Sequence, residues 1–165
     1  MASSSLPELL TRVRSGDLRA LSRLITRVEN GDPGTLSLIA ELWDDRSKAA
    51  VLGVTGPPGA GKSTFVDRLV ARFREGGHRV AVLAVDPSSP FTGGAILGDR
   101  IRMQGHAVDP AVFIRSLGTR GHQGGLSRTT FEASILCAAA GYDRIVIETV
   151  GVGQTELEVA GVADQ

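Results

Sequence analysis

Residues 56–63 read Gly-Pro-Pro-Gly-Ala-Gly-Lys-Ser and match the phosphate-binding loop pattern G-x-x-x-x-G-K-[ST]. Glycines let backbone N–H groups approach phosphate oxygens closely, and a helix N-terminus adds partial positive charge at the same place. In this chemistry the Lys62 ammonium reaches the β- and γ-phosphates, and the Ser63 hydroxyl ligates Mg²⁺. We predict a nucleotide phosphate site made of Gly56, Pro57, Pro58, Gly59, Ala60, Gly61, Lys62, Ser63 and Thr64.

The segments around this loop are those that the motif requires. The apolar run 51–55 precedes it and predicts a buried strand, and apolar residues recur at helical spacing over 65–73. Only Lys48 and Lys62 are lysines among the 18 basic residues, so the sequence strongly favours arginine elsewhere. A compact ammonium in a tight loop is something the planar guanidinium cannot replace. The alternative to a phosphate site is an ordinary glycine-rich turn.

Three carboxylates are candidates for the magnesium site. Asp86 and Glu148 each end an apolar run, at 80–85 and 145–147, and Asp99 lies in a glycine-containing polar segment. The carboxyl ends of parallel strands meet in the crevice where α/β sheets bind ligands, and Mg²⁺ prefers oxygen ligands. We predict that Ser63, Asp86, Asp99 and Glu148 form the metal site. The alternatives are a plain charge at a strand end for Glu148 and a turn cap for Asp86.

The segment after Glu148 has the composition of a nucleotide-sensing loop. Gly151 follows three residues later, a spacing suited to an N–H contact with the γ-phosphate that is lost on hydrolysis. Gln154 can then orient the attacking water, although a polar residue at a helix start is an equally good interpretation. The predicted catalytic residues are Lys62, Glu148 and Gln154. Four arginines flank the loops and are expected mainly at solvated positions: Arg100, Arg102, Arg115 and Arg120.

Strand patterns alternate with helical patterns along the chain. The continuous apolar run at 80–85 is typical of a buried parallel strand, 111–115 and 145–148 also predict strands, and 127–140 has a helical pattern. This order predicts an α/β fold: a P-loop NTPase with a mostly parallel central sheet flanked by helices. The nucleotide domain is expected to span residues 47–165.

Residues 1–46 predict a helical arm that precedes this domain. Apolar stripes over 6–13 and 18–28 predict two helices, with Asp17 as the N-cap of the second. Thr35 is expected to cap a third, short helix. The arm either packs against the domain's own sheet or forms a docking surface for a partner or a second subunit.

Composition narrows the class of protein. The chain has 165 residues and a net charge of zero, so no basic face for nucleic acid is implied. Cys137 is the only cysteine, is expected to be a small buried residue, and cannot form an internal disulfide. No stretch is apolar enough to suggest a membrane span, and a cytoplasmic location is expected. His78, His106 and His122 lack metal-ligand spacing and are expected on the surface or in loops.

Three segments together resemble one known family. Residues 85–103 read Val-Asp-Pro-Ser-Ser-Pro-Phe-Thr-Gly-Gly-Ala-Ile-Leu-Gly-Asp-Arg-Ile-Arg-Met. This stretch resembles the signature of the methylmalonyl-CoA mutase-associated GTPases of the MeaB/ArgK type. Residues 113–122 and 148–154, and the helical arm, are similar to the same family, so the resemblance covers nearly the whole chain.

The resemblance implies a function. It implies a GTPase that binds GTP, GDP and Mg²⁺ and acts as a chaperone for an adenosylcobalamin-dependent acyl-CoA mutase, gating cofactor loading and protecting the mutase. It also implies that Asp86, Asp99 and Glu148 are metal-site residues within switch segments. A homodimer is expected for a full-length protein.

The chain departs from the family at its C-terminal end. No Asn-Lys pair occurs in the sequence, so the family's guanine-specificity motif N-K-x-D is missing. We therefore expect the N-terminal portion of a longer protein, with an incomplete sheet whose exposed edge lowers stability and with poor hydrolysis by this chain alone. The alternatives are a P-loop small-molecule kinase, a metal-insertion GTPase, which should show clustered Cys and His, and a non-catalytic truncated remnant.

Overall fold

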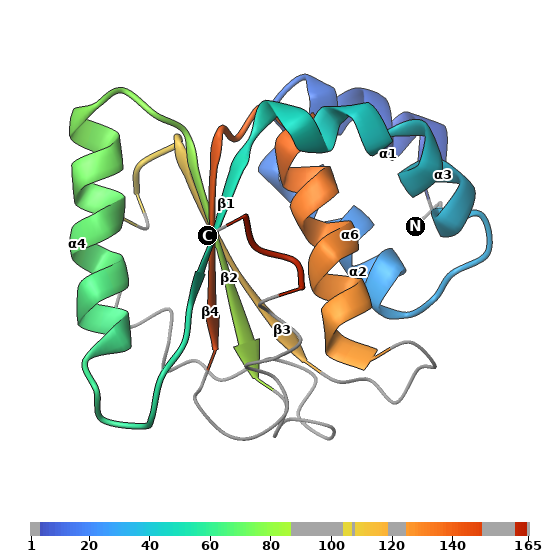
Figure 1. Ribbon diagram of the computed structural model, residues 1–165. Helices are drawn as coiled ribbons and strands as arrows, with labels where there is room; N and C mark the ends of the chain where they lie inside the picture. Colours follow the sequence, from blue (N-terminus) through green and yellow to red (C-terminus); the bar gives the residue numbers. More distant parts are fainter. Residues whose placement is uncertain (1–3, 87–103, 107, 119–124, 150–160, 165) are drawn as a thin grey trace.

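The computed structural model describes residues 4–86, 104–106, 108–118, 125–149 and 161–164. Four parallel strands form one sheet in the order β1-β4-β2-β3. Their bounds are Ala50–Val54 for β1, Val80–Asp86 for β2, Val112–Gly118 for β3 and Arg144–Thr149 for β4. Helices cover both faces of this sheet, which gives three layers (Figure 1). The predicted α/β fold with a parallel sheet is confirmed.

One face of the sheet is covered by α4 (Lys62–Glu75; Figure 1). Val66 and Val70 lie one helical turn apart and are fully buried against Val82 of β2 and Val146 of β4. The β-branched residues of the strands thus pack directly on the apolar stripe of the helix. Because α4 starts at Lys62 of the motif, this packing fixes the loop relative to the strand ends.

The other face is covered by the N-terminal helices and α6 (Gly125–Ala139; Figure 1). The N-terminal elements are α1 (Leu6–Arg14), α2 (Leu18–Glu29), α3 (Thr35–Glu41) and the 3₁₀ helix η1 (Trp43–Lys48). They share one apolar core with α6 and the sheet, in which Cys137 is fully buried as expected. Burial raises the pKa of the Cys137 thiol well above its usual value, so the group stays neutral. Of the two alternatives for the arm, the structure shows packing against the sheet of the same chain.

The helix caps agree with the sequence at one position and differ at another. Asp17 caps α2 as predicted, since its Oδ1 accepts hydrogen bonds from the N–H groups of Arg19 (2.9 Å) and Ala20 (3.0 Å). The prediction that Thr35 caps α3 is wrong. Gly34 is the N-cap, in a left-handed conformation with φ of 85°, and Thr35 is already helical with its hydroxyl donating to the Asp32 carbonyl at 2.7 Å.

A buried ion pair joins the helical arm to the sheet. Arg115 of β3 places Nη2 2.6 Å from Oε2 of Glu29 and donates to the Thr26 hydroxyl at 2.9 Å. The Glu29 side chain is only 2% exposed. The expectation that Arg115 lies at a solvated position beside the nucleotide loops is therefore wrong, because its strand position directs it to α2 instead.

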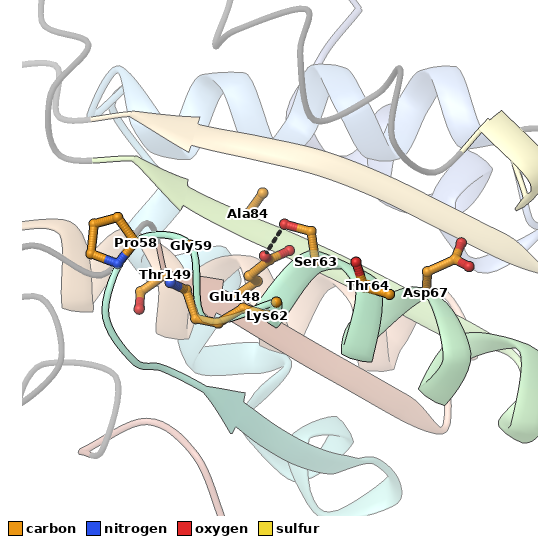
Figure 2. Close-up of a pocket in the computed structure, with 10 residues that line it drawn as sticks. Pro58, Gly59, Lys62, Ser63, Thr64, Asp67, Ala84, Glu148 and Thr149 are labelled. Atoms are coloured by element: carbon orange, nitrogen blue, oxygen red, sulfur yellow. Dashed lines mark hydrogen bonds between the residues drawn. The ribbon is translucent and has the colours of Figure 1, made fainter.

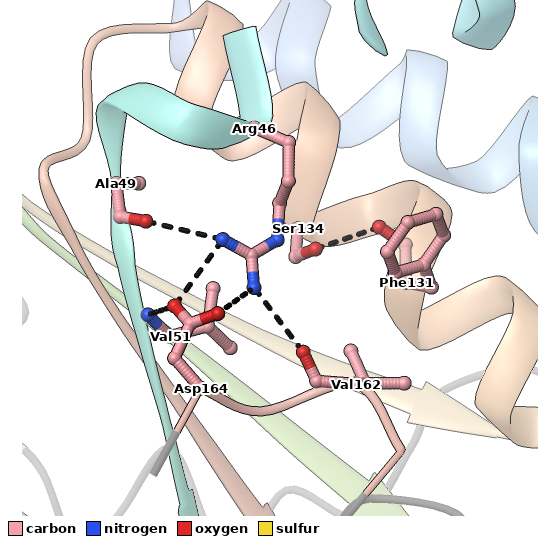
Figure 3. Close-up of polar contacts among 7 residues, drawn as sticks. All are labelled: Arg46, Ala49, Val51, Phe131, Ser134, Val162 and Asp164. Atoms are coloured by element: carbon pink, nitrogen blue, oxygen red, sulfur yellow. Dashed lines mark hydrogen bonds and ion pairs between the residues drawn. The ribbon is translucent and has the colours of Figure 1, made fainter. Parts of the chain in front are cut away.

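Asp164 lies against the outer edge of β1 (Figure 3). Its N–H donates to the Val51 carbonyl at 2.8 Å, and the Val51 N–H donates to its Oδ2 at 2.8 Å. Arg46 of η1 binds the same carboxylate, with Nη2 2.8 Å from Oδ1, and also donates to the carbonyls of Ala49 and Val162. These bonds satisfy part of the edge strand and link residues 162–164 to η1 and the start of β1.

Substitution of Glu29, the partner of Arg115 in the buried ion pair, tests how the helical arm stabilises the fold. Glu29→Ala leaves the Arg115 guanidinium without its carboxylate, and we expect the free energy of unfolding to fall by about 3–5 kcal/mol. Glu75→Ala breaks the exposed pair with Arg72 and should cost less than about 1 kcal/mol. Urea denaturation measures both. A cost for Glu29→Ala no larger than that for Glu75→Ala would contradict a structural role for the buried pair.

The Arg46–Asp164 contact predicts a pH dependence. The hydrogen bond from Arg46 lowers the pKa of Asp164 below its usual value, so its stabilising effect is present above the unfolded pKa of about 3.9. It is lost as the pH falls through the lower folded pKa. We expect the difference in urea midpoint between the unsubstituted chain and Asp164→Asn to be constant above about pH 5 and to shrink below about pH 4.

The matched control for this pH dependence is Arg46→Gln, which removes the charge that holds the carboxylate ionised. In the Arg46→Gln background, the pH-dependent part of the Asp164→Asn effect should be small. The same pH dependence in both backgrounds would show that Arg46 is not its cause.

Candidate nucleotide-binding site

The order of strands brings the phosphate-binding loop beside a strand-end carboxylate. Strand β1 leads into the loop and pairs directly with β4, with Val54 opposite Glu148. Gly59 and Gly61 adopt left-handed conformations with φ of 79° and 83°, and Lys62 then begins α4. A side chain at either glycine would strain the backbone, so the sequence pattern and the loop's turn have the same physical cause.

The Lys62 ammonium is held within the loop. Its Nζ donates to the carbonyl oxygens of Gly56 at 2.6 Å and of Pro57 at 3.0 Å. The side chain therefore folds back over the loop that precedes it. A positive charge is fixed beside the inward-turned backbone, which is the arrangement that an anionic group requires.

Ser63 and Glu148 are in direct contact (Figure 2). The Ser63 hydroxyl donates to Oε1 of Glu148 at 2.6 Å, across 85 residues of sequence. Glu148 is 7% exposed. A hydroxyl and a carboxylate oxygen side by side are the hard donors that Mg²⁺ prefers, so this pair fits the predicted metal.

Lys62, Ser63 and Glu148 line a cavity of about 590 Å³ at the carboxyl ends of the strands. That volume is in the usual range for a small-molecule site, and the position is where parallel sheets bind ligands. The lining residues are Pro58, Gly59, Gly61, Lys62, Ser63, Thr64, Asp67, Ala84, Glu148 and Thr149. Figure 2 shows α4 supplying one wall and the end of β4 another.

Of the other carboxylates and of the loop residues predicted after Glu148, the structure describes only the backbone of Asp86. Asp86 ends β2, two residues beyond Ala84, which lies opposite Glu148 in the β2–β4 register. Its backbone is thus at the predicted edge of the sheet. Asp99, Gly151 and Gln154 lie outside the described residues, and their roles stay predictions.

Three of the lining residues were not predicted as site residues from the sequence, namely Asp67, Ala84 and Thr149. Asp67 lies on α4 four residues after Ser63, and this one-turn spacing is the signal that could have identified it. Thr149 follows Glu148 directly, and its hydroxyl donates to the Thr55 hydroxyl at 3.0 Å. This bond ties the end of β4 to the start of the phosphate-binding loop.

Two of the three histidines make defined contacts rather than lying free on the surface. His78 lies just before β2 and pairs through Nδ1 with Asp143 at 2.9 Å, far from the cavity. His106 contacts Asp67 and is 17% exposed. Within the described part of the chain, no group of three or more His, Cys, Asp or Glu side chains could hold a metal ion by itself. No helix among the described residues is long and apolar enough to cross a membrane.

The fold and the site define a P-loop nucleotide-binding protein. Comparison with known proteins gives its family: the family model for "Methylmalonyl Co-A mutase-associated GTPase MeaB" matches residues 21–165. The chain belongs to this family, as its sequence motifs predicted.

Relatives in distant organisms support the assignment. The chain is 46% identical over 165 residues to GTPase ArgK of Escherichia coli, covering 98% of this chain and 50% of that protein. It is 53% identical over 113 residues to the mouse protein "Methylmalonic aciduria type A homolog, mitochondrial", covering 68% of this chain and 27% of that protein.

A solved structure shares the fold. The crystal structure of a protein titled "LAO/AO transport system kinase" matches with a TM-score of 0.73 and 36% identity, over 99% of this chain and 49% of that one. The chain thus spans about half the length of the ArgK relative and of this structure.

Proposed function

We propose that this chain is the nucleotide-binding portion of a GTP hydrolase that serves as a chaperone for an adenosylcobalamin-dependent acyl-CoA mutase. The observation that carries the proposal is the 2.6 Å contact between Ser63 of the phosphate-binding loop and Glu148 at the end of β4. It joins the two parts that a P-loop hydrolase needs beside its nucleotide, namely a phosphate cradle and a metal-site carboxylate. The proposed extents are a helical arm at 1–46 and a GTPase domain at 47–165.

Each site residue has a role in this proposal. The N–H groups of the loop bind phosphate oxygens, and Lys62 gives up its carbonyl partners to contact the β- and γ-phosphates. Ser63 and Glu148 would hold Mg²⁺, together with Asp86 and Asp99. When bound, this ion supplies positive charge that neutralises the phosphates.

Hydrolysis requires a positioned water and stabilisation of the negative charge that develops on the transferring γ-phosphate and the departing GDP. Lys62 supplies a fixed positive charge where negative charge develops, which favours the transition state over the ground state. Gln154 orients the attacking water, and the N–H of Gly151 contacts the γ-phosphate. Loss of that contact after hydrolysis gives the loop two states, through which the partner can sense the nucleotide.

The family supports the proposed partner. The family is named as mutase-associated, and the mouse relative is named for methylmalonic aciduria. In this proposal GTP binding and hydrolysis gate cobalamin loading of a methylmalonyl-CoA-type mutase and protect that enzyme. Homodimer formation is proposed for the longer protein. Selectivity for guanine is tested by competition between GTP and ATP.

The two lysines of the chain provide a matched test of phosphate binding. Lys62→Ala removes charged hydrogen bonds to phosphate, and we expect the dissociation constant for GTP with Mg²⁺ to rise about 10- to 100-fold or more. Lys48→Ala removes an equal charge from an exposed lysine paired with Asp45 and should leave the constant unchanged. Isothermal titration calorimetry measures both. Equal affinities for the two variants would contradict the proposal.

Glu148→Gln keeps the size of the side chain and removes its charge. We expect nucleotide affinity to change less than about 10-fold and single-turnover hydrolysis to slow by about 100-fold or more, because the carboxylate helps to organise charge around the transferring phosphate. The assay uses protein in excess over radiolabelled GTP, since intrinsic turnover is expected to be slow. Equal turnover in Glu148→Gln and the unsubstituted chain would end the assigned role.

A further inference from the structure

Asp67 is an acidic residue of the cavity that the phosphate-binding motif does not include. It lies on α4 four residues after Ser63, with a side chain 38% exposed, and it lines the same cavity as Glu148. Figure 2 shows Ser63, Thr64 and Asp67 following one another along the first turns of α4. Residues four apart on a helix have Cβ atoms roughly 5–6 Å apart on one face. Asp67 is therefore a near neighbour of the predicted metal ligand.

His106 holds Asp67 from outside the cavity. Nε2 of His106 lies 3.3 Å from the Asp67 carbonyl oxygen and 3.4 Å from its Oδ1. Both of these atoms are acceptors, so Nε2 carries a proton and donates towards them. The imidazole thus hydrogen-bonds to the Asp67 backbone, and its N–H also lies beside Oδ1 of the carboxylate.

The short segment that carries His106 is itself anchored to α4. It forms the 3₁₀ helix η2 (Gln104–His106), and the Asp109 N–H donates to the His106 carbonyl at 3.1 Å. Arg74 of α4 donates to Oδ2 of Asp109 at 2.8 Å, and this hydrogen bond lowers the pKa of Asp109 below its usual value. Two contacts with α4, through Asp67 and Arg74, thus hold this segment beside the cavity.

We propose that Asp67 is a positioning residue for the magnesium of the bound nucleotide, accepting a hydrogen bond from a metal-bound water. Mg²⁺ keeps several of its waters in protein sites, and their hydrogens need acceptors. A path from the Ser63 oxygen through the ion and one water to a carboxylate spans roughly 7 Å at most, which suits the one-turn spacing of Ser63 and Asp67. Among the described cavity residues, the carboxylates are Asp67 and Glu148, and Glu148 is proposed to hold the ion itself.

This inference rests on the proposed nucleotide function and has its own test. Asp67→Asn keeps the shape of the side chain and an acceptor for His106 but removes the charge. We expect the Mg²⁺ concentration that half-saturates the protein–GDP complex to rise about 10- to 100-fold, as for other outer-sphere partners. GDP affinity in EDTA should be unchanged. Fluorescence of a labelled GDP, titrated with Mg²⁺ or EDTA, measures both quantities.

Two further variants separate a metal effect from a structural one. Glu75→Gln removes an equal charge from the far end of α4, where the side chain is 64% exposed, and should leave the Mg²⁺ midpoint unchanged. His106→Gln retains a side-chain donor and should shift the midpoint less than Asp67→Asn does. If Asp67→Asn and Glu75→Gln give the same Mg²⁺ midpoint as the unsubstituted chain, the role of Asp67 is overturned.

The same titration distinguishes failure of this inference from failure of the proposed function. If the unsubstituted chain binds no guanine nucleotide at any Mg²⁺ concentration, the proposed function fails and the inference fails with it. If the chain binds GDP with a clear Mg²⁺ dependence that Asp67→Asn does not alter, only the inference about Asp67 fails.

Discussion

The short hydrogen bond between Ser63 and Glu148 is the contact on which the candidate site depends. It exists because β1 and β4 are neighbours in the sheet, so that the loop leaving one strand meets the carboxylate ending the other. The remaining order of the sheet places β2 on the far side of β4 and brings the backbone of Asp86 to the same edge. A parallel sheet thus gathers polar side chains from distant parts of the sequence at one end.

The layers around the sheet keep this end in place. On one face, the buried valines of α4 set the position of the helix that begins with Lys62 and Ser63. On the other, α6 and the N-terminal helices form a larger core, reinforced by the buried Glu29–Arg115 pair. Asp164 and Arg46 fasten the β1 edge to η1. Packing on both faces of the sheet therefore holds the phosphate-binding loop in place, as a site with fixed hydrogen-bond donors requires.

Local patterns were the predictable part of this structure. The phosphate-binding loop is encoded by glycines at left-handed positions, and strands β2 and β4 by apolar runs that are followed by an acidic residue. Contacts between distant residues were not predictable from such patterns. The sequence around Arg115 does not indicate that its partner is Glu29. The Asp67–His106 contact likewise joins residues 39 positions apart in the chain. Thr35 is not the N-cap of α3, because the left-handed residue Gly34 takes that position and Thr35 is already helical.

We propose that the backbone amides of the phosphate-binding loop bind the phosphates of a nucleotide and that the Glu148 carboxylate lies next to these phosphates. Amide chemical shifts from ¹⁵N-labelled protein, recorded with and without GDP and Mg²⁺, test it directly. We expect the largest changes at the amides of Gly59, Gly61, Lys62 and Ser63, with smaller changes at Glu148 and Thr149. Saturable binding whose largest changes lie elsewhere, with the amides of residues 59–63 unmoved, would contradict it.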